Sequence, residues 1–325
     1  MSTQKEKERR RVLITGCSDN SLGSALAIAF HAAGLEVYAT ARDTTKMQAL
    51  TDYPNIHLVR LDVQSDDSIA ECVRQVPSPL DILVNNAGGG YNMPVVDLSI
   101  ADAKKLFDLN VWGGLAVTQA FMPHLLASAS GSGSGSTVSG RGNTTIVNHT
   151  SAASCCPVPF QGAYSASKAA MSSLTSTLRL ELEPFDIHVI ELKTALVASN
   201  FPLNVQAKGA VLPDTSIYAP AKDVLEESIT GDIFKAEEPF MPAEEWAASV
   251  VSDVLSYGAG AGPGAGLGLG AWSGLGAGGG TVWRGARAWL VRIGSVLPAG
   301  FLNRSCRDVV QMDEINRLIR SSNSG

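Results

Sequence analysis

Three residues in the middle of the chain have the types and the spacing for acid–base chemistry: Ser151, Tyr164 and Lys168. A helix that opens after Pro159 would place the tyrosine and the lysine on one face, one turn apart. A phenol has a pKa near ~10, and a neighbouring ammonium lowers that pKa, which makes the phenol a usable proton donor. With a serine hydroxyl to hold a carbonyl oxygen and a hydride carrier nearby, this set could reduce a ketone or oxidise an alcohol. The same tyrosine–lysine spacing is common on the surfaces of ordinary helices, so the surrounding elements must decide.

Composition excludes several other classes of function. The chain has 325 residues with 25 basic and 31 acidic side chains, and its net charge of -6 argues against nucleic-acid binding. With 45% hydrophobic and 17% charged residues it is typical of a globular protein. Its five cysteines form no C-x-x-C pair, so we expect no metal site, and an odd, scattered set is typical of a reducing compartment. We expect neither a secretory signal nor a membrane-spanning helix.

A phosphate-binding turn is predicted near the N-terminus. Residues 12–14 are a short apolar run typical of a buried parallel strand, and the loop T-G-C-S-D-N-S-L-G separates them from an alanine-rich helix. A strand, a glycine turn and a helix N-terminus together present backbone N–H groups and a positive dipole end to a phosphate. The predicted cofactor contacts here are Thr15, Gly16, Ser18 and Gly23. An ordinary turn between a strand and a helix is the alternative.

The end of the second predicted strand, residues 35–40, distinguishes between nicotinamide cofactors. An acidic residue there would bind the ribose 2′-hydroxyl, whereas an arginine accommodates a 2′-phosphate. Ala41 is not acidic and Arg42 is basic, so the sequence favours NADPH over NADH, with an exposed Arg42 paired to Asp43 as the alternative. Asp62, at the end of the third predicted strand, is expected to approach the adenine ring.

Strands and helices alternate through residue 192. A fourth strand at 80–84 runs into N-N-A-G-G-G, where small residues let a backbone approach a cofactor closely, and strands at 145–148 and 187–192 follow. A long helix is predicted over 101–126, and its buried Asn110 needs a hydrogen-bonding partner. This alternation predicts an α/β fold with a doubly wound parallel sheet of the Rossmann type, whose ligands bind at the carboxyl ends of the strands.

We expect a single domain over residues 11–257, with a C-terminal helical and flexible extension. The predicted parts around and within it are a charged tail at 1–10, a flexible insertion at 127–142, a substrate-covering segment at 202–240, a Gly/Ala-rich linker at 258–280 and an amphipathic extension at 281–325. Within 281–302, tryptophans and arginines are interspersed with aliphatic residues, a pattern typical of helices in a membrane interface. A partner-facing or pocket-capping helix is an equal alternative.

One histidine and one pair of cysteines could each have either a reactive or a structural role. His149 could act as a base, but a strand histidine is more often structural, and Tyr164 with Lys168 already supplies that chemistry. Cys155 and Cys156 are adjacent and could be redox-active, although small residues that line a pocket are the favoured interpretation.

The motifs taken together resemble the short-chain dehydrogenase/reductase family over residues 11 to 255. The matching elements are Thr15-Gly16…Gly23, Asn85-Asn86-Ala87-Gly88, Asn110, Ser151 and the run from Tyr164 to Lys168. Within that family, T-G-C-S…L-G, V-Y-A-T-A-R-D and A-L-V-A-S-N-F look most like fungal NADPH-dependent 1-acyldihydroxyacetone-phosphate reductases and the related 17β-hydroxysteroid dehydrogenases.

The resemblance implies a role for each matching residue. Tyr164 would exchange the proton, Lys168 would bind the nicotinamide ribose and lower the pKa of Tyr164, and Ser151 would orient the substrate carbonyl. Asn110 would hold a water that links Lys168 to solvent. The cofactor contacts implied elsewhere are Asn86, Ala87 and Gly88 on the adenosine side and Val197 with its neighbours at the carboxamide.

Two departures from the family pattern lie at the cofactor loops. The first loop is one residue longer than T-G-x-x-x-G-x-G, and Asn20 or Ser21 replaces its middle glycine; asparagine tolerates positive φ. The loop after the sixth strand reads Leu192-Lys193-Thr194-Ala195 where the family usually has Pro-Gly. Pyrophosphate binding and nicotinamide positioning depend on these loops.

We therefore expect an NADPH-dependent reductase that converts a hydrophobic, lipid-like ketone to a secondary alcohol. The alternatives are an oxidative dehydrogenase of a sterol- or retinoid-type alcohol and a non-catalytic relative that binds the cofactor. The expected location is cytoplasmic, with contact at the endoplasmic reticulum or a lipid-droplet surface through 281–302, and family members are often homo-oligomers.

Overall fold

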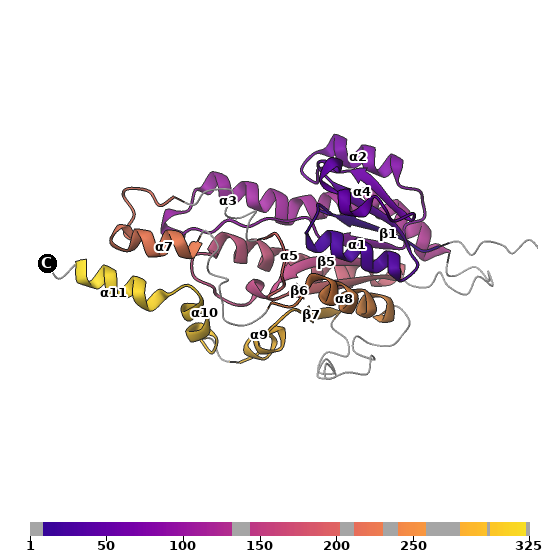
Figure 1. The fold of residues 1–325 in the computed structure, drawn as a ribbon. Helices are drawn as coiled ribbons and strands as arrows, with labels where there is room; N and C mark the ends of the chain where they lie inside the picture. Colours follow the sequence, from indigo (N-terminus) through magenta and orange to yellow (C-terminus); the bar gives the residue numbers. More distant parts are fainter. Residues whose placement is uncertain are drawn as a thin grey trace, which may run out of the picture.

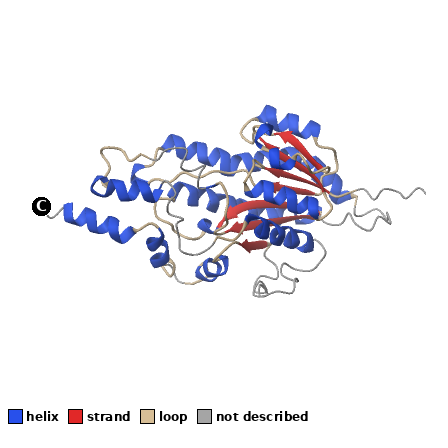
Figure 2. Ribbon diagram, in the orientation of Figure 1, coloured by secondary structure: helices blue, strands red, loops and turns tan. Residues whose placement is uncertain are grey.

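The computed structural model describes residues 9–131, 144–201, 211–229, 240–257, 280–297 and 300–322. Their strands form one parallel sheet in the order β3-β2-β1-β4-β5-β6-β7 (Figures 1 and 2). The strands are Arg11–Thr15 (β1), Glu36–Ala41 (β2), Ile56–Arg60 (β3), Ile82–Asn85 (β4), Thr144–Ser151 (β5), Ile187–Thr194 (β6) and Thr281–Arg284 (β7). The predicted α/β fold with a doubly wound parallel sheet is confirmed.

Apolar side chains bury both faces of this sheet, as a parallel sheet requires. On one face, Val12 and Ile14 of β1 pack with residues of α1 (Leu22–Ala32) and α8 (Ala243–Tyr257), including the fully buried Trp246. On the other face, Leu13 packs with residues of α2 (Asp66–Gln75) and α4 (Gly113–Ser130). Figure 1 shows α1 beside α8, away from α2. The alternation of the strand residues therefore sends successive side chains into two separate cores.

The helix predicted over 101–126 has an interruption at Asn110. It consists of α3 (Ile100–Phe107), a π-helical turn (Asp108–Trp112) and α4, and the Gly113 N–H donates to the Asp108 carbonyl across five residues. A π turn inserts one extra residue into a helix and often marks a functional site. The helix also runs further than expected: α4 continues to Ser130, so the predicted flexible insertion at 127–142 is wrong for residues 127–130. Residues 132–143 lie outside the described part.

The segment predicted to cover the substrate, 202–240, is described only from residue 211 to residue 229 and at residue 240. It contains α7 (Lys222–Ile229), whose Leu225 and Ile229 share an apolar cluster with Val310 and Ile315 of the C-terminal region. The remaining helices are α5 (Gly162–Leu182), α9 (Ala288–Gly294), α10 (Asn303–Val309) and α11 (Met312–Ser322). Figure 1 places α7 beside α11, at the end of the molecule remote from α2.

The extension predicted from residue 281 is not separate from the domain. Thr281–Arg284 forms β7, the edge strand beside β6, with Val282 opposite Leu192 and buried in the core of α1 and α8. The four-residue strand follows a Gly/Ala-rich tract, and its pairing with β6 is not local, so the sequence pattern did not identify it. Residues 1–8 and 258–279 of the predicted tail and linker lie outside the described part. Within the described residues, the helices are too short or too polar to cross a membrane.

Candidate active site

The strand β5 and the helix α5 bring Ser151, Tyr164 and Lys168 together. Ser151 is the last residue of β5, a short turn over Ala152–Ser154 follows, and α5 begins at Gly162, so Tyr164 lies in its first turn and Lys168 one turn later. Ser151 is hydrogen bonded to Tyr164. The Ser151 Oγ also accepts the Ala153 N–H at 3.1 Å, which fixes the serine at the mouth of the turn.

Lys168 is buried between α5 and the rim of the sheet. Its Nζ donates to the His149 carbonyl at 2.9 Å and lies 6.0 Å from the centre of the Tyr164 ring. Burial lowers the pKa of Lys168 to about 8, because an ammonium loses hydration in this position. Gly88 faces the same nitrogen and Asn110: a Cβ there would lie 3.4 Å from Nζ and 3.2 Å from Asn110 Oδ1, so the tighter contact would be with the asparagine.

The pKa of Tyr164 differs from the sequence expectation. Burial raises this pKa, and the hydrogen bond with Ser151 lowers it by less. The lysine was expected to lower it, but the ammonium is directed at the His149 carbonyl, and the Phe201 ring lies 5.6 Å from the tyrosine ring. Enclosure of the phenol therefore dominates, and Tyr164 keeps its proton at neutral pH.

The side chain of Asn110 joins the rim of the sheet to α5. Its Oδ1 accepts the Gly89 N–H at 2.8 Å, and its Nδ2 donates to the Gly89 carbonyl at 2.9 Å and to Ser167 Oγ at 3.0 Å. This buried amide lies within the π turn. Its predicted role in holding a water beside Lys168 stays a prediction.

The lengthened loop after β1 is tight despite its missing glycine. Gly16 has φ +76° and Asn20 has φ +59°, so the asparagine takes the left-handed conformation, as its residue type permits. Gly23 packs on the loop so closely that a Cβ would lie 2.3 Å from the Gly16 carbonyl oxygen. Ser21 caps α1 by accepting the Ser24 N–H at 3.1 Å. The Ser18 carbonyl accepts the Ser21 N–H at 3.1 Å within the same turn.

Thr15 and Asn86 connect that loop to the turn after β4. The Thr15 hydroxyl oxygen accepts the N–H groups of Asn86 and Ala87, both at 2.9 Å. The Asn86 side chain in turn donates to the Thr15 and Gly16 carbonyls at 2.7 and 3.1 Å. These predicted cofactor contacts thus form one hydrogen-bonded unit, with Gly88 two residues further along.

His149 connects polar residues from neighbouring strands of the site through both of its ring nitrogens. The Asn86 amide nitrogen is occupied by two carbonyls, so its oxygen accepts from His149 Nδ1 at 2.9 Å, and the Thr194 hydroxyl then donates to Nε2 at 2.7 Å. The ring stacks on Trp246 at 5.5 Å. Burial and the nearby Lys168 lower the pKa of His149 to about 3, so the imidazole is neutral and both nitrogens are in use. These bonds leave it no role as a base, in agreement with the favoured structural interpretation.

The other predicted cofactor residues lie at strand ends along the same rim. Arg42 follows β2 and is exposed, whereas the Asp43 carboxylate accepts the Thr45 N–H at 3.0 Å and caps a local turn. Asp62 follows β3 and accepts the Gln64 N–H at 3.1 Å. Val197 follows β6, is buried, and forms an isolated backbone β-bridge with Met241.

The sequence did not point to Thr194 and Asn200, whose side chains form hydrogen bonds to neighbouring strands and loops at the carboxyl end of the sheet. Asn200 Nδ2 donates to the Asp19 carbonyl at 3.0 Å, and its backbone N–H donates to the Asn20 carbonyl at 3.2 Å. The loop after β6 is therefore attached to the loop after β1. A polar residue shortly after the sixth strand was the available signal, but its partner lies 181 residues away.

These residues fit a dinucleotide. The N-terminus of α1 faces the turn from Gly16 to Ser21, which presents N–H groups and the positive helix end to a pyrophosphate. Asp19, the acidic residue in that loop, is directed away: its carboxylate accepts the N–H groups of Gln48 and Ala49 at 3.1 and 2.9 Å. Its negative charge is thereby engaged outside the predicted phosphate position.

Comparison with protein families and curated proteins gives a consistent result. The family model for short chain dehydrogenase matches residues 10–208. A short-chain dehydrogenase/reductase of Pestalotiopsis microspora is 40% identical over 96% of this chain and 98% of its own length. An NADPH-dependent 1-acyldihydroxyacetone phosphate reductase of Schizosaccharomyces pombe is 33% identical over 93% of this chain and 94% of its own length.

Solved structures share the fold. A short-chain dehydrogenase from Burkholderia cenocepacia in complex with NADP superposes with a TM-score of 0.63 at 20% identity, over 92% of this chain and 98% of that one. The closed form of a serine dehydrogenase complexed with NADP+ has a TM-score of 0.60 at 25% identity, over 75% and 88% of the two chains.

The variant His149→Phe tests the positioning role of His149. Phenylalanine can keep the stacking on Trp246 but leaves Asn86 Oδ1 and the Thr194 hydroxyl without their imidazole partner, which should cost about 1–3 kcal/mol of folding stability. We expect dinucleotide affinity to fall about tenfold, a change of ~1.4 kcal/mol, because the Asn86 side chain loses its histidine partner and keeps only its bonds to the Thr15 and Gly16 carbonyls. Urea unfolding and equilibrium titration measure the two effects.

Thr194→Val is the matched control, since it removes only the Nε2 partner and should have the smaller effect. A neutral imidazole in the folded protein predicts that the effect of His149→Phe on dinucleotide affinity stays constant from about pH 5 to about pH 8. Its effect on the free energy of unfolding should shrink as the pH falls below the ordinary histidine pKa, because only the unfolded wild-type chain then takes up a proton. An effect on affinity that titrates near that pKa would contradict the assigned neutral, fully bonded state.

Proposed function

Since the chain belongs to the short-chain dehydrogenase/reductase family of oxidoreductases, we propose that it uses NADPH to reduce a hydrophobic, lipid-like ketone to a secondary alcohol. The observation that carries the proposal is the hydrogen-bonded pair of Ser151 and protonated Tyr164, with Lys168 one turn away on α5. NADPH, when bound, supplies the hydride. The protein supplies the position of the carbonyl and the proton.

The site's own residues divide this work. The Ser151 hydroxyl binds the carbonyl oxygen and holds it beside the phenol. Tyr164 donates its proton to that oxygen as negative charge develops there. Lys168 places a positive charge close to the phenol and is within reach of the rim where the nicotinamide ribose would lie.

The protonation state of Tyr164 is compatible with the proposed reduction. Burial raises the pKa of this phenol, so the form that can donate a proton predominates. An oxidative sterol- or retinoid-type dehydrogenase needs the deprotonated form to accept a proton from the alcohol. The intact Ser151, Tyr164 and Lys168 set argues against the non-catalytic alternative.

NADPH is proposed over NADH because of the end of β2. Thr40 is buried in the strand, Ala41 has no charge, and the exposed Arg42 is free of its neighbour Asp43, whose carboxylate caps a turn. A guanidinium in this position suits a 2′-phosphate. The S. pombe relative is described as NADPH-dependent, which supports the same choice.

A lipid-like substrate is proposed from the apolar residues near the site and from one relative. Phe160, four residues before Tyr164, clusters with Met93, Leu212 and Leu225, the last two from the segment predicted to cover the substrate. Phe201 lies against the tyrosine ring itself. The S. pombe relative acts on 1-acyldihydroxyacetone phosphate by its name, so an acylated keto compound is the first substrate to try.

Turnover of a ketone panel by wild type and by Tyr164→Phe tests this proposal. Loss of the proton donor should lower kcat by about 10²–10⁴-fold, while NADPH binding changes little, because the phenol oxygen donates to the carbonyl rather than to the cofactor. NADPH consumption measures the rate, and fluorescence titration measures binding. Binding without turnover by wild type on every ketone would favour the non-catalytic alternative.

The pH profile of kcat/KM tests the role of Lys168. Burial lowers its pKa to about 8, so the ammonium is present below that pH and is lost as the pH rises through it. The rate of reduction should therefore hold steady below about pH 8 and fall above it, since the raised pKa of Tyr164 keeps the phenol protonated over the same range. In Lys168→Arg the side chain stays charged and the basic limb should move upward; an unmoved limb would assign it to another group.

We also propose a cytoplasmic protein that contacts lipid surfaces through residues 281–302. Trp289 and Ile293 are one turn apart on α9 and exposed, and Val296, Leu297 and Phe301 extend the exposed apolar surface. An aromatic and aliphatic surface of this kind suits a membrane interface. Homo-oligomerisation stays a prediction.

Flotation with vesicles of phosphatidylcholine and an anionic phospholipid tests this contact. Wild type should float with the vesicles, and Trp289→Asp should reduce the bound fraction several-fold, because a carboxylate resists insertion. Leu180→Asp, at an exposed leucine of α5, is the matched control and should float like wild type. Failure of wild type to float would overturn the proposal.

A further inference from the structure

Two cysteines from distant parts of the chain are in contact where the segment between β5 and α5 packs on the C-terminal helices. Cys156 lies in the segment between Ser151 and α5, and Cys306 lies on α10, 150 residues later. Their sulfur atoms are 3.0 Å apart, and the residues are only 9% and 5% exposed. Within the described part of the chain, no other hydrogen bond joins two cysteine sulfurs.

Apolar side chains enclose the two thiols. Leu302 packs with both cysteines, and Leu290 and Val291 of α9 lie against the same cluster. The hydrogen bond between the sulfurs raises the pKa of Cys156 and lowers that of Cys306. Either sulfur can be the donor in this hydrogen bond, and the thiolate forms more readily at Cys306.

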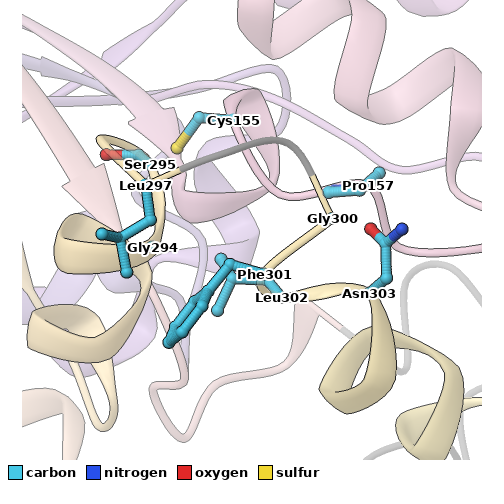
Figure 3. Close-up of a pocket in the computed structure, with 9 residues that line it drawn as sticks. All are labelled: Cys155, Pro157, Gly294, Ser295, Leu297, Gly300, Phe301, Leu302 and Asn303. Carbon is cyan, nitrogen blue, oxygen red and sulfur yellow. The ribbon is translucent and has the colours of Figure 1, made fainter.

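A cavity of about 310 Å³ adjoins this cluster. Figure 3 shows the residues that line it: Cys155, Pro157, Gly294, Ser295, Leu297 and residues 300–303. Leu302 belongs to the cavity wall and to the cysteine cluster. The cavity therefore lies next to the apolar side chains that enclose the two thiols.

We propose that Cys156 and Cys306 form a disulfide site that covalently joins the segment between β5 and α5 to the C-terminal helices. A disulfide bond is about 2.05 Å long, so the sulfurs need to approach by about 1 Å, a movement within reach of side-chain rotation. The bond would connect the segment that carries Ser151 and Phe160 to α10, and through it to α11, which packs on α7.

The oxidant is a low-molecular-weight disulfide such as oxidised glutathione. The Cys306 thiolate attacks one of its sulfurs, which forms a mixed disulfide and releases one thiol after protonation. Cys156 then loses its proton, attacks the Cys306 sulfur and displaces the second thiol. Two protein thiols and one small disulfide thus give one protein disulfide and two small thiols.

Peptide mapping of the full-length protein tests the site without any variant. Protein freed of reductant is incubated with oxidised glutathione or with dithiothreitol, its remaining thiols are alkylated, and unreduced digests are analysed by mass spectrometry. We expect one linked pair, containing Cys156 and Cys306 and lacking two hydrogens. The melting temperature should rise by roughly 5 °C, because the link constrains a long loop of the unfolded chain, and dithiothreitol should reverse both changes.

Three variants complete the test. Cys156→Ser and Cys306→Ser should each abolish the linked pair and the thermal shift, while the adjacent Cys155→Ser should retain both. The proposal is overturned if Cys156 and Cys306 are still alkylated after the oxidation has been carried out under partial denaturation. It is also overturned if Cys155 replaces either of them in the link, or if the reaction stops at a glutathione adduct. Because these readouts need no substrate, their outcome is independent of the proposed reductase activity.

Discussion

A row of side-chain hydrogen bonds crosses the carboxyl ends of four adjacent strands, and the active site depends on it. Thr15 ends β1, Asn86 follows β4, His149 lies in β5, and Thr194 ends β6. Each residue binds the next, so the loop after β1, the turn after β4 and the loop after β6 are held at fixed positions. The His149 carbonyl at the centre of this row also accepts from Lys168.

One layer deeper, a second row supports the first. Asn85 donates to Thr118 and to Asn148, both at 2.8 Å, and Asn148 donates to Thr175 of α5 at 3.0 Å. Buried polar groups of this kind are costly unless they are bonded, so their partners specify the relative positions of strands and helices. These polar bonds connect the strands and helices beneath the rim, whereas α7 and α11 share an apolar cluster with Met93 and Phe160.

Much of the fold followed from local patterns. The apolar run at β1, the glycine turn and the tyrosine–lysine spacing are local features, and the structure brings the predicted residues to one rim. Three features were not predictable in this way. The partners of His149 lie 63 and 45 residues away, the strand β7 follows a Gly/Ala-rich tract and pairs with a strand distant in the sequence, and the π turn at Asn110 has no distinctive composition. The Tyr164 pKa depended on enclosure by residues that a four-residue spacing cannot reveal.

We propose that a hydride passes to a carbonyl carbon at this site while Tyr164 protonates the oxygen. The most direct measurement follows the label from NADPH that carries deuterium at both nicotinamide C4 positions, with an acylated keto compound as substrate. We expect an alcohol with one deuterium on the carbinol carbon, and none on that carbon when unlabelled NADPH is used in deuterated water. Product without the label, or with carbon-bound deuterium taken from solvent, would contradict it.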